Sequence, residues 1–105
     1  MIKDLVSVII PSSIGDLIYA KKCAESVENS TYKNIHIEIV CEGFERSRQR
    51  NIGISRANGE FILFLDSDQR VHPDMIADCV KRIKYFGGVY IPEVVMGDDW
   101  FAKLR

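Results

Sequence analysis

The sequence lacks several features that would assign it to a specialised class of protein. Its three cysteines, Cys23, Cys41 and Cys79, are an odd number at wide spacings without a CxxC pair, so we expect neither a disulfide framework nor a zinc site. No apolar run reaches the roughly 18 residues that a membrane span requires. Lys and Arg total 14 against 15 Asp and Glu, a balance that gives no field attracting nucleic acid. We therefore expect a cytoplasmic protein with no nucleic-acid partner and no membrane span.

Internal repeats, low-complexity segments and linkers rich in proline, glycine or serine are also missing. The chain has 105 residues, of which 47% are apolar and 28% are charged. That composition is ordinary for a soluble globular protein, and a chain of this length buries about two thirds of its unfolded surface. We therefore predict that residues 1–105 form a single domain around one core.

What the sequence does contain is an alternation of apolar patterns along the chain. Apolar segments of strand length occur at four places, namely residues 5–10, 35–41, 61–65 and 89–91. Helical patterns lie between them, and we expect the first helix to be capped by Asp16, the second by Ser47 and the third to begin near Pro73. The second helix is expected to end at Asn58-Gly59, where glycine suits the left-handed conformation.

This alternation predicts an α/β fold with a Rossmann-like, mostly parallel sheet flanked by helices. The segment FILFL (61–65) is apolar throughout, so we expect it to be a central strand buried on both faces. Open parallel sheets bind ligands outside the carboxyl ends of their strands. Those ends carry PSS (11–13), EGF (42–44) and DSD (66–68), which predicts a ligand site at this edge.

The acidic pair Asp66 and Asp68 is the first candidate site. At a spacing of two in an extended chain, both carboxylates leave from the same side and repel each other. Mg²⁺ and Mn²⁺ prefer hard oxygen ligands, and Mg²⁺ typically takes one or two carboxylates together with phosphates and water. The pair is therefore a candidate metal site. The alternative is that the two acids only shape a turn and cap the helix that follows.

A second charged feature is FERSRQRNIGISR (44–56), which holds four arginines and one acid. Guanidinium groups match phosphate oxygens in a bidentate manner and stay charged at any working pH. Arg50 is distinguished because Asn51 and Gly53 follow it, and a glycine within a helix costs about 1 kcal/mol unless it permits a close approach. We therefore predict that Arg50 contacts a ligand, while Arg46, Arg48 and Arg56 suit a solvated helix face. An acidic pair that could hold a metal ion and an arginine, both at the same edge of the sheet, suggest a diphosphate ligand.

Four segments, taken in order, resemble the N-terminal, nucleotide-binding part of family 2 glycosyltransferases with the GT-A fold. They are VSVIIPSS, SVENSTYKNIHIEIVCEG, RNIGISRANGEFILFLDSD and VHPDMI, and they lie between residues 5 and 76. The resemblance implies a truncated GT-A fold that binds a nucleotide diphospho-sugar through Mn²⁺ or Mg²⁺. It also implies sugar transfer with inversion, by direct attack of an acceptor hydroxyl that a carboxylate base assists.

The resemblance assigns roles to individual positions. Asp66 and Asp68 match the DxD motif, in which the first acid faces the ribose and metal and the second binds the metal. Where the family commonly has DDGS, this chain has CEGF, so Glu42 is expected to keep a hydrogen-bond role without implying uracil recognition. Arg50 matches an arginine associated with the phosphates. The residues expected at the nucleotide are Pro11, Ser12, Ser13, Glu42, Arg50, Asp66 and Ser67.

Catalytic residues stay unassigned, because the family places its base well beyond the DxD motif. Asp98 or Asp99 in GDDWFAKLR (97–105) is only a weak match to the later acidic motif. We expect these last residues to form an amphipathic helix, whose apolar side chains could dock a second copy, a partner chain or a further segment. The enzyme would then be incomplete as this chain.

Three alternatives differ in function class. The same fold could be a non-catalytic nucleotide-sugar-binding module that lacks the acceptor half. A phosphoacceptor signalling domain needs further acids after its first strand, where this chain has PSS. A sugar nucleotidyltransferase needs a glycine-rich, basic loop at the same place, which the sequence does not contain. Metal-dependent nucleotide binding without transfer would favour the binding module over the enzyme.

Overall fold

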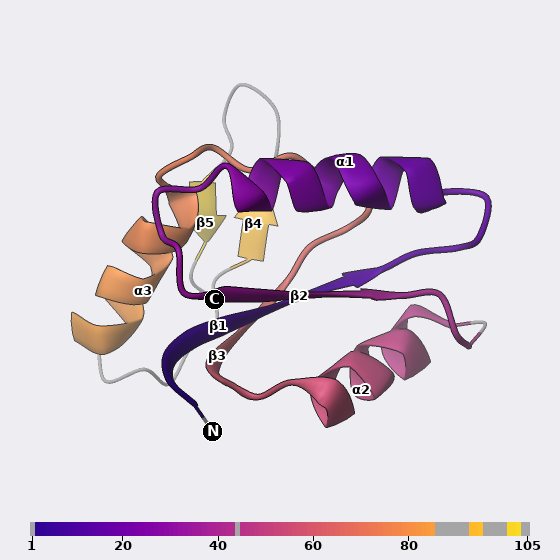
Figure 1. Ribbon diagram of the computed structural model, residues 1–105, viewed down its shortest axis with the longest axis horizontal. Coiled ribbons are helices and arrows are strands. Elements are labelled where there is room, and N and C mark those ends of the chain that lie inside the picture. The colour runs from indigo at the N-terminus through magenta and orange to yellow at the C-terminus, as the bar shows by residue number, and fades with distance from the viewer. Residues whose placement is uncertain (1, 44, 86–92, 96–100, 104–105) are drawn as a thin grey trace.

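The computed structural model describes residues 2–43, 45–85, 93–95 and 101–103. Strands and helices alternate along the chain, as the sequence patterns predict (Figure 1). The elements are β1 (Ile2–Pro11), α1 (Leu17–Glu28), β2 (Ile35–Val40), α2 (Arg46–Arg56), β3 (Gly59–Phe64), α3 (Met75–Tyr85), β4 (Glu93–Val95) and β5 (Phe101–Lys103).

The first three strands form a parallel sheet in the order β2-β1-β3. Val8 in the middle of β1 lies opposite Ile37 of β2 and Leu63 of β3. Because the strands are parallel, their carboxyl ends meet at one edge of the sheet, at the right of Figure 1. The prediction of an α/β fold with a parallel sheet and flanking helices is thus confirmed.

The central strand of this sheet is β1 and not the FILFL segment. β1 is hydrogen-bonded on both sides, and every residue from Leu5 to Pro11 is buried. β3 lies at the edge of the three-stranded sheet, where Phe61, Ile62 and Phe64 are only half-buried. Among the strands that the structure describes, residues 61–65 therefore do not take the predicted central position. A continuous apolar run indicates that the faces of a strand are buried, but it does not show how many strands pair with its edges.

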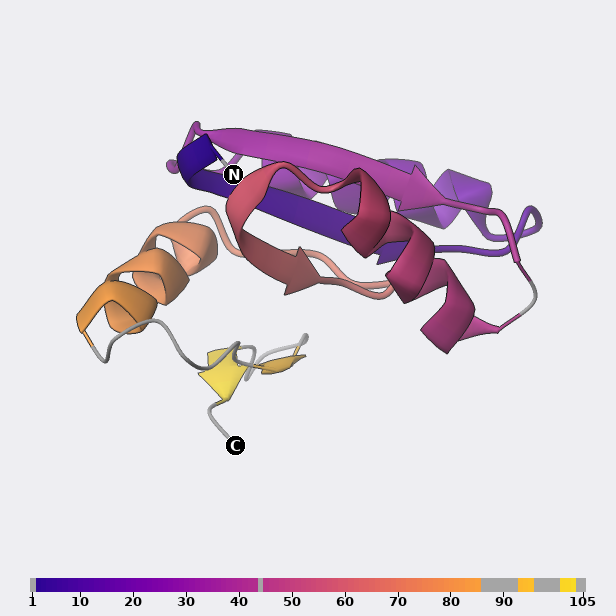
Figure 2. The ribbon, with the colours of Figure 1, turned by 90° about the horizontal axis from the view of Figure 1, so that it is seen from below.

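Helices cover the two faces of the sheet unequally. One core cluster joins Val6, Val8 and Ile10 of β1 to the apolar sides of α1 and α3. The opposite face is covered by α2, which lies in front of the sheet in Figure 2 while α1 lies behind it. There, Gly53 lies directly against Ile9, which has no exposed surface. At this contact α2 lies very close to β1.

Two predicted helix boundaries differ in detail. α2 begins at Arg46, with Glu45 at the N-cap position, so Ser47 lies inside the helix and does not cap it. The residue before α1 is Asp16, as predicted, but its side chain makes no capping hydrogen bond. Both helices are instead held by their packing against the sheet, which commonly outweighs local capping.

The predicted left-handed turn at Gly59 is also absent. Among the described glycines, only Gly43 has a positive φ, at 87°. Gly59 begins β3, and its amide donates to Ser7 Oγ at 2.9 Å. A Cβ there would lie 2.5 Å from the Leu5 carbonyl oxygen. The glycine therefore serves close approach between two strands and not a turn.

The expected amphipathic helix at the end of the chain does not form where the structure describes it. Residues Phe101–Lys103 are strand β5, which pairs antiparallel with β4. A short apolar stretch is compatible with a helix or a strand. Here the backbone of β5 pairs with that of β4. The predicted strand at 89–91 lies outside the described residues, as do Asp98 and Asp99. No helix in the described part of the chain is long and apolar enough to cross a membrane.

Candidate functional site

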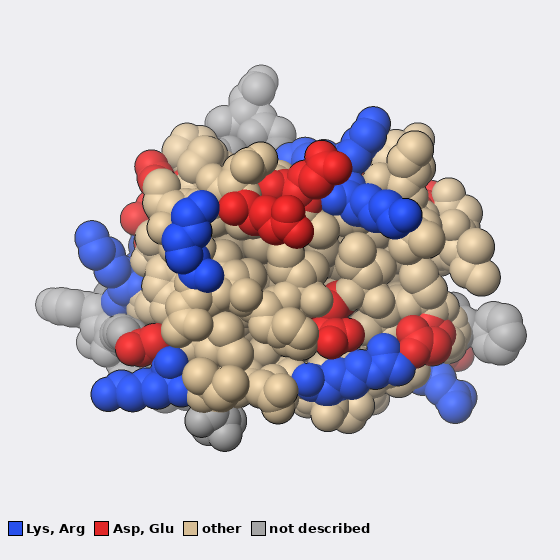
Figure 3. Space-filling view, viewed as in Figure 1, with Lys and Arg blue, Asp and Glu red and all other residues tan. Residues whose placement is uncertain are grey.

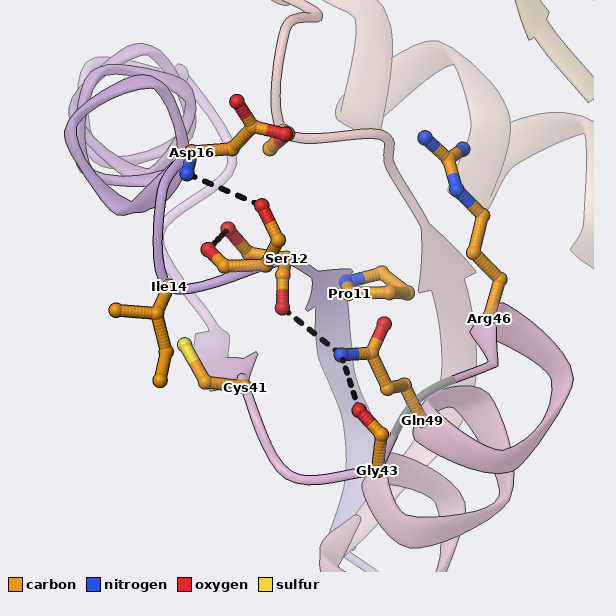
Figure 4. Close-up of a pocket in the computed structure, with 10 residues that line it drawn as sticks. Pro11, Ser12, Ile14, Asp16, Cys41, Gly43, Arg46 and Gln49 are labelled. Atoms are coloured by element: carbon orange, nitrogen blue, oxygen red, sulfur yellow. Dashed lines mark hydrogen bonds between the residues drawn. The ribbon is translucent and has the colours of Figure 1, made fainter.

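A cavity of about 360 Å³ opens at the carboxyl edge of the sheet. It lies between the loop after β1, the loop after β2, the first two turns of α2 and the end of β3 (Figure 4). The residues that line it are Pro11, Ser12, Ser13, Ile14, Asp16, Cys41, Gly43, Arg46, Gln49 and Ser67. The site is therefore at the edge that the strand order predicts.

The loop after β1 is held in place by short hydrogen bonds. The Ser12 amide donates to the Val40 carbonyl at 2.9 Å, which ties the loop to β2. Ser12 Oγ donates to the Ser13 carbonyl at 2.8 Å, and the Asp16 amide donates to Ser13 Oγ at 3.1 Å. Both serine hydroxyls are thus used locally, and together they fix the wall from which α1 starts.

Gln49 joins that wall to the loop after β2. Its side chain is buried, and Nε2 donates to the Ser12 carbonyl at 2.8 Å and to the Gly43 carbonyl at 3.5 Å (Figure 4). Gly53, one turn further along α2, allows this contact, because a side chain there would hold the helix away from Ile9. Arg46, Gln49 and Gly53 share one face of α2 at helical spacing. Gln49 therefore forms the floor of the cavity.

One side of the cavity is lined by Arg46 and Ser67, and Asp66 pairs with Arg46 at its rim. Arg46 Nη1 lies 2.7 Å from Asp66 Oδ1. The Asp66 amide donates to Gln69 Oε1 at 2.7 Å, which fixes the start of the turn. Ser67 is buried against the cavity, whereas Asp68 is exposed. Since 62% of the Arg46 side chain is exposed, a pair of this kind contributes only ~0–1 kcal/mol and exchanges readily.

The cavity brings together Pro11, Ser12, Ser13 and Ser67, and Asp66 contacts its rim through Arg46. Three further predicted residues do not line it: Glu42, Arg50 and Asp68. Asp68 is nevertheless only two residues from Asp66 on the same turn. Its role as a metal ligand stays a prediction.

Glu42 and Arg50 have other neighbours. Glu42 forms an ion pair with Arg56, and this hydrogen bond holds the pKa of the Glu42 carboxyl below its usual range. Arg50 lies over the ring of Phe64, with Cζ 5.5 Å from the ring centroid, an arrangement typical of a cation–π contact. The nucleotide roles that the resemblance implies for these two residues remain predictions.

Sequence reasoning missed Arg46 and Gln49 as cavity residues. Their spacing of three, followed by Gly53 four residues later, is a helical stripe that could have indicated a shared face. The stripe was not recognised because it contains no apolar side chain.

On the face drawn in Figure 3, the basic side chains, coloured blue, do not form one continuous patch.

Comparison with known proteins assigns the chain to a family. The sequence model of glycosyl transferase family 2 matches residues 24–99, which is more than half of the chain. The chain belongs to glycosyltransferase family 2. No solved structure gives a significant match.

Relatives of known name point the same way. Glycosyltransferase GlyA of Streptococcus pneumoniae serotype 4 is 27% identical over 109 residues, which cover 79% of this chain and 16% of GlyA. Glycosyltransferase GlyG of the same organism is 28% identical, over 77% of this chain and 36% of GlyG. EpsH of Bacillus subtilis strain 168 is 35% identical over 53% of this chain and 24% of EpsH. The chain thus spans between 16% and 36% of the length of these relatives.

Proposed function

We propose that this chain forms the nucleotide-binding part of an inverting glycosyltransferase, which takes a nucleotide diphospho-sugar together with Mn²⁺ or Mg²⁺. The observation that carries the proposal is the cavity at the carboxyl edge, where a guanidinium and the DSD segment lie beside the serine-lined loop after β1. Membership of the family supports glycosyl transfer as the reaction class.

The side chains present fit a divalent ion that arrives with a diphosphate. Asp66 and Asp68 supply carboxylate oxygens of the kind that Mg²⁺ and Mn²⁺ prefer. No group of three or more His, Cys, Asp or Glu side chains suitable for a metal occurs in the described residues. The protein would thus provide only part of a coordination shell, as is usual where phosphate oxygens and water complete it. When bound, such an ion supplies positive charge to the leaving diphosphate.

Arg46 is the guanidinium best placed to meet the diphosphate. It lines the cavity and already holds a carboxylate oxygen at 2.7 Å, so its donors are directed at the position where an anion would lie. A preorganised cation of this kind stabilises charge that grows on the leaving group during sugar transfer. Arg50, one turn further along the helix, would add a more distant positive charge. The acceptor site and general base are left unassigned, since Asp98 and Asp99 fall outside the described residues.

Calorimetric titration with nucleoside diphosphates, with and without Mn²⁺, tests the metal assignment. Asp68→Asn should abolish the gain in affinity that Mn²⁺ produces, while the far-UV spectrum and unfolding midpoint stay unchanged. Asp78→Asn, which makes the same charge change at an exposed position on α3, is the matched control and should bind as the parent chain does. Equal Mn²⁺ dependence in Asp68→Asn and the parent would refute the assignment of Asp68 as a metal ligand.

The same assay distinguishes the roles of Arg46 and Arg50. Arg46→Ala should weaken a nucleoside diphosphate by about 10-fold or more, since hydrogen bonds to charged groups contribute about 1.5–3 kcal/mol, and should leave the corresponding nucleoside unaffected. Arg50→Ala should have a smaller effect. If Arg50→Ala has the larger effect on the diphosphate, the phosphate site belongs to Arg50 instead. Binding without hydrolysis or transfer would favour the non-catalytic module.

A further inference from the structure

The orientation of the Gln49 amide is determined by its neighbours. Nε2 faces two carbonyl oxygens, those of Ser12 at 2.8 Å and Gly43 at 3.5 Å. Turning the amide over would place its oxygen against the same two carbonyls, so that three acceptors would meet without a donor. The hydrogen-bond network therefore distinguishes the two ends of the amide, which geometry alone seldom does. The residue is only 6% exposed, which restricts the side chain further.

This leaves Gln49 Oε1 as an acceptor on the cavity side. In Figure 4 the oxygen points away from the Ser12 and Gly43 carbonyls, into the space between Pro11 and Arg46. Within the part of the chain that the structure describes, no group donates a hydrogen bond to it. An acceptor in a confined site favours a ligand that brings an N–H or O–H group, and it disfavours a ligand that brings another lone pair.

The surroundings of Oε1 indicate which part of a nucleotide it would meet. Pro11, Cys41 and Gly43 form an uncharged side of the cavity next to Gln49. Arg46 lies one helical turn away and faces Asp66. A planar, uncharged base suits the first side and the phosphates suit the second. The acceptor therefore lies at the base end of the cavity.

We propose that Gln49 Oε1 selects the nucleobase, accepting a hydrogen bond from a ring N–H. Uracil, thymine and guanine carry such a donor, whereas the corresponding ring nitrogen of cytosine and adenine is an acceptor. The ligand class is thus a uridine-, thymidine- or guanosine-type nucleoside diphosphate. This inference rests on the proposed function and assigns a specificity-determining residue within the same cavity.

The first test is a calorimetric panel of UDP, GDP, CDP and ADP on the full chain with Mn²⁺. At least one of UDP and GDP should bind about 10- to 100-fold more tightly than CDP and ADP, because a mismatch leaves two acceptors facing each other. Gln49→Met keeps the length of the side chain but cannot accept this bond, and should bring the ratio close to one. Arg48→Met, at an exposed position on the same helix, should leave the ratio unchanged.

A ligand variant tests the proposal on the parent chain, whatever the stability of Gln49→Met. The N-methylated form of the preferred diphosphate, methylated at N3 of uracil or N1 of guanine, should bind at least 10-fold more weakly. A purely structural role for Gln49 predicts that Gln49→Met weakens all four diphosphates by the same factor, and that result would overturn the proposal. Binding of CDP or ADP as tight as that of the tighter of UDP and GDP, or equal binding of the methylated and unmethylated forms of the preferred diphosphate, would overturn it too, while leaving the proposed function intact. If no diphosphate binds, the proposed function itself fails.

Discussion

The contact between Gly53 and Ile9 leads to a prediction that can be worked through from the structure. A Cβ built on Gly53 would lie 2.4 Å from Ile9 Cγ2 and 3.1 Å from both Cγ1 and Cδ1. Carbon atoms pack best at about 3.5–4.0 Å, so the closest pair is more than about 1 Å too near. Ile9 has no exposed surface and cannot turn away without disturbing other core residues.

Gly53→Ala should therefore destabilise the fold, although alanine is the better helix former. Overpacking of a core costs about 1–3 kcal/mol, and replacing glycine by alanine in a helix returns about 1 kcal/mol. Because the clash is large, we expect a net loss of about 1–2 kcal/mol. With an m-value near 1.5 kcal/mol/M, the urea midpoint should fall by about 1 M.

A double-mutant cycle identifies the cause. Ile9→Ala alone should cost about 2–5 kcal/mol, but it removes all three crowded atoms and should cost about 1–2 kcal/mol less when Gly53→Ala is present. Ile9→Val is the matched control, since it keeps Cγ2 and leaves the 2.4 Å contact in place. Additive effects of Gly53→Ala and Ile9→Ala, or a stabilising Gly53→Ala, would refute the close approach.

Two further predictions concern the interior of the sheet and the thiols. Gly59→Ala should destabilise the fold by about 3 kcal/mol or more in urea unfolding. Its Cβ would lie 2.5 Å from the Leu5 carbonyl oxygen and 2.8 Å from the Ser7 nitrogen, and these backbone atoms cannot rotate away. An unchanged urea midpoint would contradict the close approach of β3 to β1. Burial raises the pKa of the Cys23 and Cys79 thiols from 9.0 to about 11. Since the unfolded chain releases these protons first, stability should be unaffected by both thiols below about pH 9 and should fall between about pH 9 and pH 11. A Cys23→Ser, Cys79→Ser double variant with the same alkaline decline would exclude that cause.

Much of the fold follows from local patterns. The alternation of apolar strand segments with helical stripes defines the element order and the parallel sheet, and the ends of the strands locate the cavity. The outer place of β3 among the described strands does not follow, because FILFL is equally apolar for an edge or a central strand. Which strand is central depends on pairing between distant segments, which a local pattern does not record.

The site was predictable in part for a related reason. Ser12, Ser13, Asp66 and Ser67 were identified from their positions after strands, and the structure places them at or beside the cavity. The sequence correctly marked Gly53 as a point of close approach, but the partner is Ile9 and not a ligand. Which arginine faces the cavity depends on the rotation of α2 about its axis. That rotation is determined by the contact with β1, so Arg46 could not be preferred over its neighbours from sequence alone.

Under the proposed function, the pairing of Arg46 with Asp66 would make the guanidinium and a divalent ion compete for the Asp66 carboxylate. A divalent ion that bound the Asp66 carboxylate would weaken this ion pair and leave the guanidinium of Arg46 available to a phosphate. Binding of the ion and binding of the nucleotide should then be positively coupled, because each would weaken the contact between Arg46 and Asp66. High ionic strength, which shortens the Debye length to about 3 Å at 1 M, would loosen the resident contact and so weaken this interdependence.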